Sequence, residues 1–63
     1  MYSVLSQKKS PTEGYLYEYV ADTTADLADI LEEKPESAQG STVIVIANSA
    51  VYMLDGNGNW AEL

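Results

Sequence analysis

Residues 42–47, with the sequence Thr-Val-Ile-Val-Ile-Ala, are apolar at both alternating sets of positions. β-Branched residues favour strands, and a strand that is apolar on both sides needs cover on both faces of its sheet. Two turn signals follow, at Asn48-Ser49 and in the Asp-Gly-Asn-Gly of residues 55–58. They separate two further strands, residues 51–54 and 59–63. The last third of the chain is therefore predicted to be a three-stranded antiparallel meander.

The lengths of these turns assign each meander residue to a face. A two-residue turn at Asn48-Ser49 pairs Ala47 with Ala50. One face then collects Ile44, Ile46, Val51 and Met53, and the other collects Val43, Val45, Tyr52 and Leu54. A two-residue turn at Gly56-Asn57 or at Asn57-Gly58 places Trp60 and Glu62 with Met53, and Ala61 and Leu63 with Tyr52. Both faces of the predicted sheet are apolar.

The first half of the chain supplies one more strand and one helix. Residues 15–20, Tyr-Leu-Tyr-Glu-Tyr-Val, alternate tyrosines with other residues, as a strand does. Residues 22–35 predict a helix with Thr23 as N-cap, Asp26 as the partner of a capping box, and an end before Pro35. Residues 1–14 are expected to be an arm or short strand plus a polar connector, and residues 15–63 a single small domain. We therefore predict an α+β fold with a small, mostly antiparallel sheet and one short helix.

One short helix can cover only one face of this sheet. The second face must pack against the N-terminal arm or against another subunit. A chain of 63 residues buries only roughly 60% of its unfolded surface, and small domains usually add disulfides, metals or partners. The chain has no cysteine, so disulfides are excluded and oligomerisation is the expected device.

The residue inventory argues against catalysis and against bound cofactors. The chain has no histidine and no cysteine, and its three lysines lie in polar segments. Asp55, Asn57 and Asn59 match the opening of a calcium-binding loop, but the sixth position is Trp60 and no glutamate stands at the twelfth. We expect no enzyme activity, no cofactor and no metal site, and we interpret residues 55–58 as a turn.

The net charge of −7 restricts the partners. A surface this acidic repels phosphate backbones and anionic lipids, so neither nucleic acid nor a membrane is expected to bind. No apolar run approaches a membrane span, and the N-terminus lacks the residue order of a signal peptide, which predicts a protein made in a cytoplasm. The acidity serves solubility, or it mimics nucleic acid in a small inhibitor.

Aromatic residues are the other candidates for recognition. Tyrosine and tryptophan suit contacts that are half in water. The alternating tyrosines either shield one face of the sheet or contact a partner. Together with the meander they give the candidate interface residues Tyr15, Tyr17, Tyr19, Ile44, Ile46, Met53 and Trp60.

Residues 15–63 combine turns and core positions in one pattern, at Asp22, Thr23, Ala25, Asp26, Leu27, Gly40, Ser41, Val51 to Asp55, Gly58, Trp60, Glu62 and Leu63. In this pattern the chain resembles a family of known proteins, the small virion structural proteins of tailed bacteriophages and prophages. A departure is the turn at residues 48–50, where many such proteins carry glycine before Val-Tyr.

This resemblance implies a structural component of a bacteriophage particle, either a capsid decoration or head-fibre-like protein or a tail-associated one. Its partners would be copies of itself, trimers being frequent among fibre modules, and other virion proteins. The protein would be made in the bacterial cytoplasm and function in the virion. The alternative is a small acidic phage-encoded inhibitor that mimics nucleic acid or binds a basic host protein.

Overall fold

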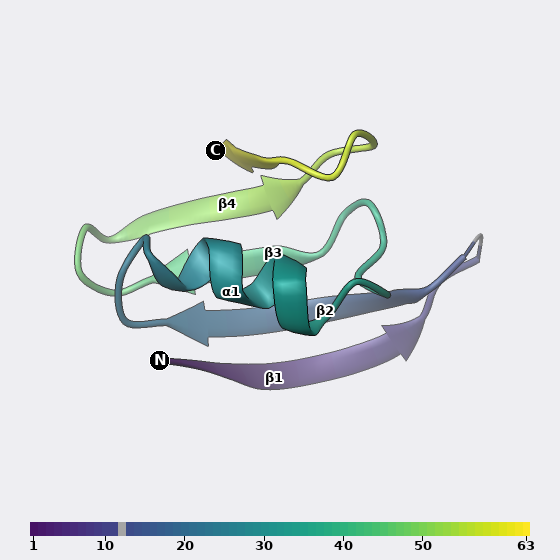
Figure 1. Cartoon of the computed structure of the whole chain (residues 1–63), viewed down its shortest axis with the longest axis horizontal. Helices are drawn as coiled ribbons and strands as arrows, with labels where there is room; N and C mark the ends of the chain where they lie inside the picture. The colour runs from purple at the N-terminus through teal and green to yellow at the C-terminus, as the bar shows by residue number, and fades with distance from the viewer. Residues whose placement is uncertain (12) are drawn as a thin grey trace.

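The computed structural model describes residues 1–11 and 13–63, which form five strands and one helix. The elements are β1 (Tyr2–Lys9), β2 (Tyr15–Ala21), α1 (Asp26–Glu33), β3 (Thr42–Val45), β4 (Ala50–Leu54) and β5 (Trp60–Glu62). The strands make one sheet in the order β1-β2-β3-β4-β5 (Figure 1). This is the small α+β fold, with a mostly antiparallel sheet and one short helix, that the sequence predicts.

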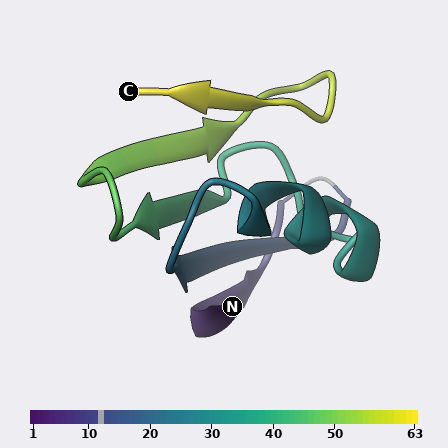
Figure 2. The same cartoon turned by 60° about the vertical axis from the view of Figure 1, so that its left-hand side comes forward.

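The helix lies on one face of the sheet, in the connection between β2 and β3 (Figures 1 and 2). Those two strands are parallel, and every other neighbouring pair is antiparallel. A parallel pair requires a long crossover, which a two-residue turn cannot provide. The single helix of the described chain is therefore also what makes the sheet mixed.

The core lies between α1 and the sheet. Ile30 is the fully buried apolar residue of the helix, and beneath it Tyr19, Val43 and Val45 are almost completely buried. Side chains on β2 and β3 alternate between this buried face and the opposite face, as strand geometry requires. Residues that complete the core are Tyr17 and Ala21, with Tyr2, Leu27, Tyr52 and Trp60 packed against them.

The helix ends as predicted but begins later. Lys34 is the C-cap, directly before Pro35. The N-cap is Ala25 rather than Thr23, so that part of the prediction is wrong. The Asp26 N–H donates to the Thr23 carbonyl at 3.2 Å, so residues 23–25 form a tight turn ahead of the helix. The Asp26 carboxylate accepts from the Thr23 N–H at 3.2 Å, which is one half of the predicted capping box.

β1 is longer than the N-terminal segment suggests, and it lies at the edge of the sheet. It pairs antiparallel with β2, with a register shift between Val4 and Ser6. A bulge of this kind twists an edge strand and discourages pairing with other chains. Because β1 extends the sheet sideways, it does not cover the second face.

The predicted register between β3 and β4 is wrong by two residues. Ile44 pairs with Val51 and Val45 pairs with Ala50, so the loop has four residues, 46–49, instead of two. A shift of two keeps every side chain on its predicted face, because the period of a strand is two. The division of the meander into two faces therefore holds in β3 and β4.

The longer loop has a physical cause in the neighbouring strand. The Ile46 N–H donates to the Ala21 carbonyl at 2.9 Å, and the Ala47 N–H donates to the Asp22 carbonyl at 3.0 Å. These bonds hold residues 46 and 47 toward the end of β2, so they are not available to β4. Ser49 then closes the loop with a φ of 54°.

The hairpin at residues 55–59 places Trp60 on the face opposite to the predicted one. The Asp55 N–H donates to the Asn59 carbonyl at 2.9 Å, which leaves a three-residue loop, Gly56–Gly58. Gly58 has a φ of +84°, the left-handed conformation that ends such loops. A loop of odd length reverses the parity, so Trp60 pairs with Leu54 and Ala61 with Met53. The predicted placement of Trp60 with Met53 is wrong, and that of Ala61 with Tyr52 is wrong as well.

Candidate interaction surface

The face of the sheet opposite α1 is uncovered in the part of the chain that the structure describes. We call it the bare face. Its central row runs across three strands, since Val20 pairs with Ile44 and Ile44 with Val51. Met53 follows in the next row beside Thr42. Apolar side chains from β2, β3 and β4 are thus neighbours on one surface.

These large apolar side chains are exposed together on one surface. Ile44 is 47% exposed, Val51 and Met53 are each 37% exposed, and Ile46 at the end of β3 is 59% exposed. On the other face of the same strand, Val43 and Val45 are fully buried. Grouped apolar exposure of this kind marks an interaction surface more often than scattered exposed residues do.

The bare face carries little charge. The strand pairing places Lys8 and Glu18 on it, one of each sign, and no other charged residue of the described strands. They occupy neighbouring rows on β1 and β2, toward one side of the apolar group. A shallow hollow of about 210 Å³ lies around them, with Leu16, Thr42 and Gly40 in its lining. The bare face is therefore an apolar surface with a polar border.

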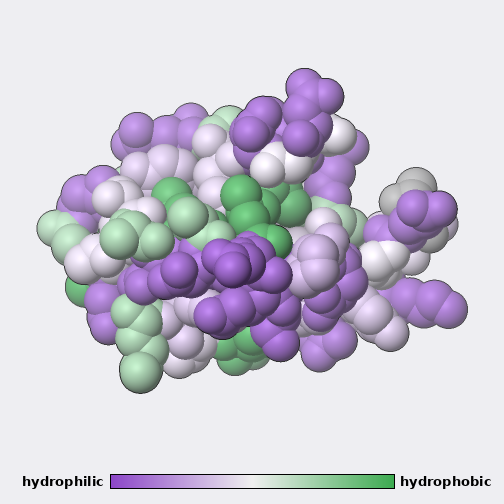
Figure 3. Space-filling view, viewed as in Figure 1, coloured by the Kyte–Doolittle hydropathy of each residue, from purple (hydrophilic) through white to green (hydrophobic). Residues whose placement is uncertain are grey.

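The helix side has the opposite character. Six of the ten acidic residues fall within residues 22–36, the connection that contains α1. Figure 3 views this side and shows hydrophilic residues across its middle. The helix has acidic residues in its first turn and no basic residue in its last. The molecule thus has an acidic layer on one side and an apolar face on the other.

The structure divides the seven candidate interface residues between these two sides. Ile44 and Met53 lie on the bare face, with Ile46 adjoining it. Tyr17 and Tyr19 are buried under the helix, with rings stacked 5.2 Å apart. Those two tyrosines shield the core face, which is one of the two roles that their alternation left open. Tyr15, at the start of β2, is 39% exposed.

Trp60 also belongs to the helix side. Its indole N–H donates to the Leu27 carbonyl at 3.1 Å, and its ring meets Tyr19 edge-on at 6.3 Å. This hydrogen bond ties β5 to the helix across the core. The predicted placement differs because a two-residue turn was expected between β4 and β5.

Hydrogen bonds from two tyrosine hydroxyls join the sheet to the helix and to the segment after it. Tyr2 donates to Glu33 at 2.6 Å and Tyr17 donates to Glu36 at 2.7 Å. Because each hydroxyl donates to a carboxylate, the neutral phenol is favoured and the pKa of each tyrosine rises to about 12. These carboxylates therefore join the strands to the helix and to the segment after it.

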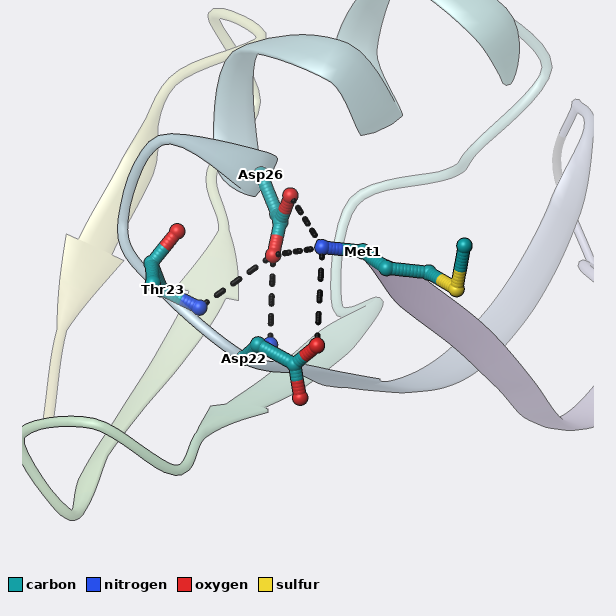
Figure 4. A network of polar contacts seen from close by, with 4 residues as sticks. All are labelled: Met1, Asp22, Thr23 and Asp26. Carbon is teal, nitrogen blue, oxygen red and sulfur yellow. Dashed lines mark hydrogen bonds and ion pairs between the residues drawn. The ribbon is translucent and has the colours of Figure 1, made fainter.

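A network around Asp26 joins the start of β1 to the start of the helix (Figure 4). The Met1 amine donates to both carboxylate oxygens of the buried Asp26, at 2.8 Å each, and lies 3.6 Å from Asp22. The amine hydrogen bond and the Thr23 N–H lower the pKa of Asp26, and Asp26 in turn raises the pKa of the amine. Sequence reasoning identified Asp26 only as a cap, because the amine is distant in the chain.

The Asp55 side chain explains the calcium-like spacing in its loop. Its Oδ1 accepts hydrogen bonds from the Asn57 and Asn59 N–H groups, both at 2.9 Å. The alternate polar residues thus shape a turn, as predicted. Within residues 1–11 and 13–63, no group of three or more carboxylates is placed to hold a metal ion.

Comparisons with known proteins add no assignment. No protein family, no curated protein and no solved structure matches this chain. Nor is any helix in the described residues long and apolar enough to cross a membrane.

Proposed function

We propose that this protein is a non-enzymatic structural component of a bacteriophage particle, which acts by burying its bare face against copies of itself or other virion proteins. The observation that supports this proposal is the exposed group of Ile44, Val51 and Met53 on a domain with a small core. Burial of such a group contributes roughly 25 cal/mol for each Å² of apolar surface removed from water. The resemblance of residues 15–63 to small virion proteins of tailed bacteriophages supports a role in the particle.

The proposal is tested on particles from a phage or prophage that encodes the chain. We expect the 63-residue chain to remain with particles through density-gradient purification, as detected by mass spectrometry. The substitution Ile44→Lys should release the chain from the particles, because an unpaired charge in an apolar interface is costly. A chain found only in the soluble fraction, with intact particles free of it, would contradict the proposal.

The acidic helix layer supports a second candidate, an inhibitor that binds a basic host protein. Asp29, Glu32 and Glu33 lie on α1 and are exposed. A basic partner would be captured by the wild-type chain in low salt and lost in high salt. Replacing Asp29 and Glu32 with glutamine would weaken that capture, and Ile44→Lys would not. This pattern would favour the inhibitor over the structural protein.

A further inference from the structure

We propose that the bare face is the interface of a symmetric dimer, in which two copies of this chain pack sheet against sheet. This inference rests on the proposed use of that face and names its occupant. The dimer would have four layers, with one helix on each outer side and the two sheets between them. It would bury the Ile44–Val51 row of both copies, the row that the monomer leaves exposed.

Charge restricts the contact between two copies to the bare face. Each chain has a net charge of −7, so two copies repel each other over most of their surfaces. The bare face is the exception, because Lys8 and Glu18 are its only charged residues in the described strands and they have opposite signs. A basic partner would instead be drawn to the acidic helix layer. A neutral apolar face is complementary to another neutral apolar face.

The size of the face agrees with a small dimer interface. The longest and middle extents of the chain are 31 and 19 Å, and Figure 1 views the sheet across these two directions. A face that filled both extents would cover on the order of 600 Å² per copy, and two such faces would reach the lower limit of stable interfaces at about 1,200 Å² in total. The bare face lies within these dimensions, so the dimer interface belongs among the small ones.

Two-fold symmetry places Lys8 where it remains hydrated. An axis that lies in the plane of the face and passes near the Ile44–Val51 pair brings each apolar group onto its copy. Lys8 lies toward the β1 edge, away from that pair, and so falls at the rim. The hollow beside Lys8 and Glu18 leaves room for water there. An apolar centre with a polar rim is the usual anatomy of an interface.

The test is the solution mass of the purified chain, measured by sedimentation equilibrium over a range of concentrations. We expect the wild type to reach twice the 6.9 kDa of one chain. Ile44→Lys and Met53→Lys should each raise the dissociation constant at least about tenfold, because they bring an unpaired charge into the interface. The matched control is Ala28→Lys, which adds the same charge on exposed helix surface and should leave the dimer intact.

The outcomes separate this inference from the proposed function. A wild type that stays monomeric to about 100 µM, a range in which weak interfaces form, would overturn the dimer. So would a trimer, or a dimer that both lysine variants preserve while their circular dichroism shows an intact fold. If Ile44→Lys still releases the chain from particles in any of those cases, the function stands and another virion protein occupies the face. A dimer that never associates with particles would leave the inference standing and the function refuted.

Discussion

The stability that each face of the sheet contributes can be compared by making the same substitution, Val→Ala, once on each face. Val43 and Val51 both lie in central strands, but Val43 is fully buried under the helix and Val51 is 37% exposed on the bare face. Val→Ala removes two carbons, worth about 1.6 kcal/mol when fully buried. The cavity left at position 43 brings the expected loss to about 2.5 kcal/mol. At position 51 water fills the space, and the loss should be about 1 kcal/mol.

Urea unfolding followed by Trp60 fluorescence measures both values, because the indole lies against the core. A domain of this length has a total stability of about 3 to 9 kcal/mol, so Val43→Ala removes a large share of it. The two midpoints should differ by roughly 0.5 to 1.5 M urea. Measurements at several dilutions, extrapolated to low concentration, separate the single chain from any assembly. Equal losses, or a larger loss at Val51 in dilute solution, would refute the assignment of the two faces.

Three further predictions concern the polar contacts. Asp26 has a lowered pKa and the Met1 amine a raised one, so their contribution should be complete between their ordinary values of 3.8 and 8.0. It should fade as pH drops through the pKa of Asp26 or rises through that of the amine, and acetylating the amine should abolish the alkaline loss in thermal melts. Trp60→Phe removes the hydrogen bond to Leu27 and should cost about 1 kcal/mol in urea unfolding, followed by circular dichroism because the variant has no tryptophan, with little change in the native spectrum. Asp55→Ala should cost about 1 kcal/mol and leave the melting temperature independent of millimolar calcium, as in the wild type; a calcium-dependent rise in the wild type would contradict the turn interpretation.

The sequence predicts the elements of the fold well because their signals are local. The apolar run at residues 42–47 and the tyrosine alternation at residues 15–20 each identify a strand from their own spacing. Pro35 sets the end of the helix from its immediate neighbourhood. The division of one strand into two faces follows in the same way from its period of two, whereas the match between the faces of neighbouring strands depends on the turn length.

What the sequence does not predict depends on contacts between distant segments and on the length of one loop. The four-residue loop after β3 exists because Ile46 and Ala47 bond to the end of β2. Trp60 lies on the helix side because Asp55 organises a three-residue loop, and one residue reverses the parity. For the candidate surface, the sequence identified Ile44 and Met53 but could not say that the helix would cover the tyrosines instead.

The separation of charge and apolar surface has a consequence for specificity. An exposed apolar face invites indiscriminate association, and natural proteins limit this by repulsion elsewhere on the surface. Here the acidic layer lies on the opposite side of a molecule only 18 Å thick along its shortest axis, a distance at which it still opposes other acidic chains in dilute salt. Approach to the face edge-on or from the helix side is therefore disfavoured, whereas sheet-to-sheet approach keeps both acidic layers farthest apart. Added salt should weaken the repulsion that disfavours the other approaches, so higher aggregates should increase with ionic strength. The Ile44→Lys variant should remain soluble, because it lacks the continuous apolar face.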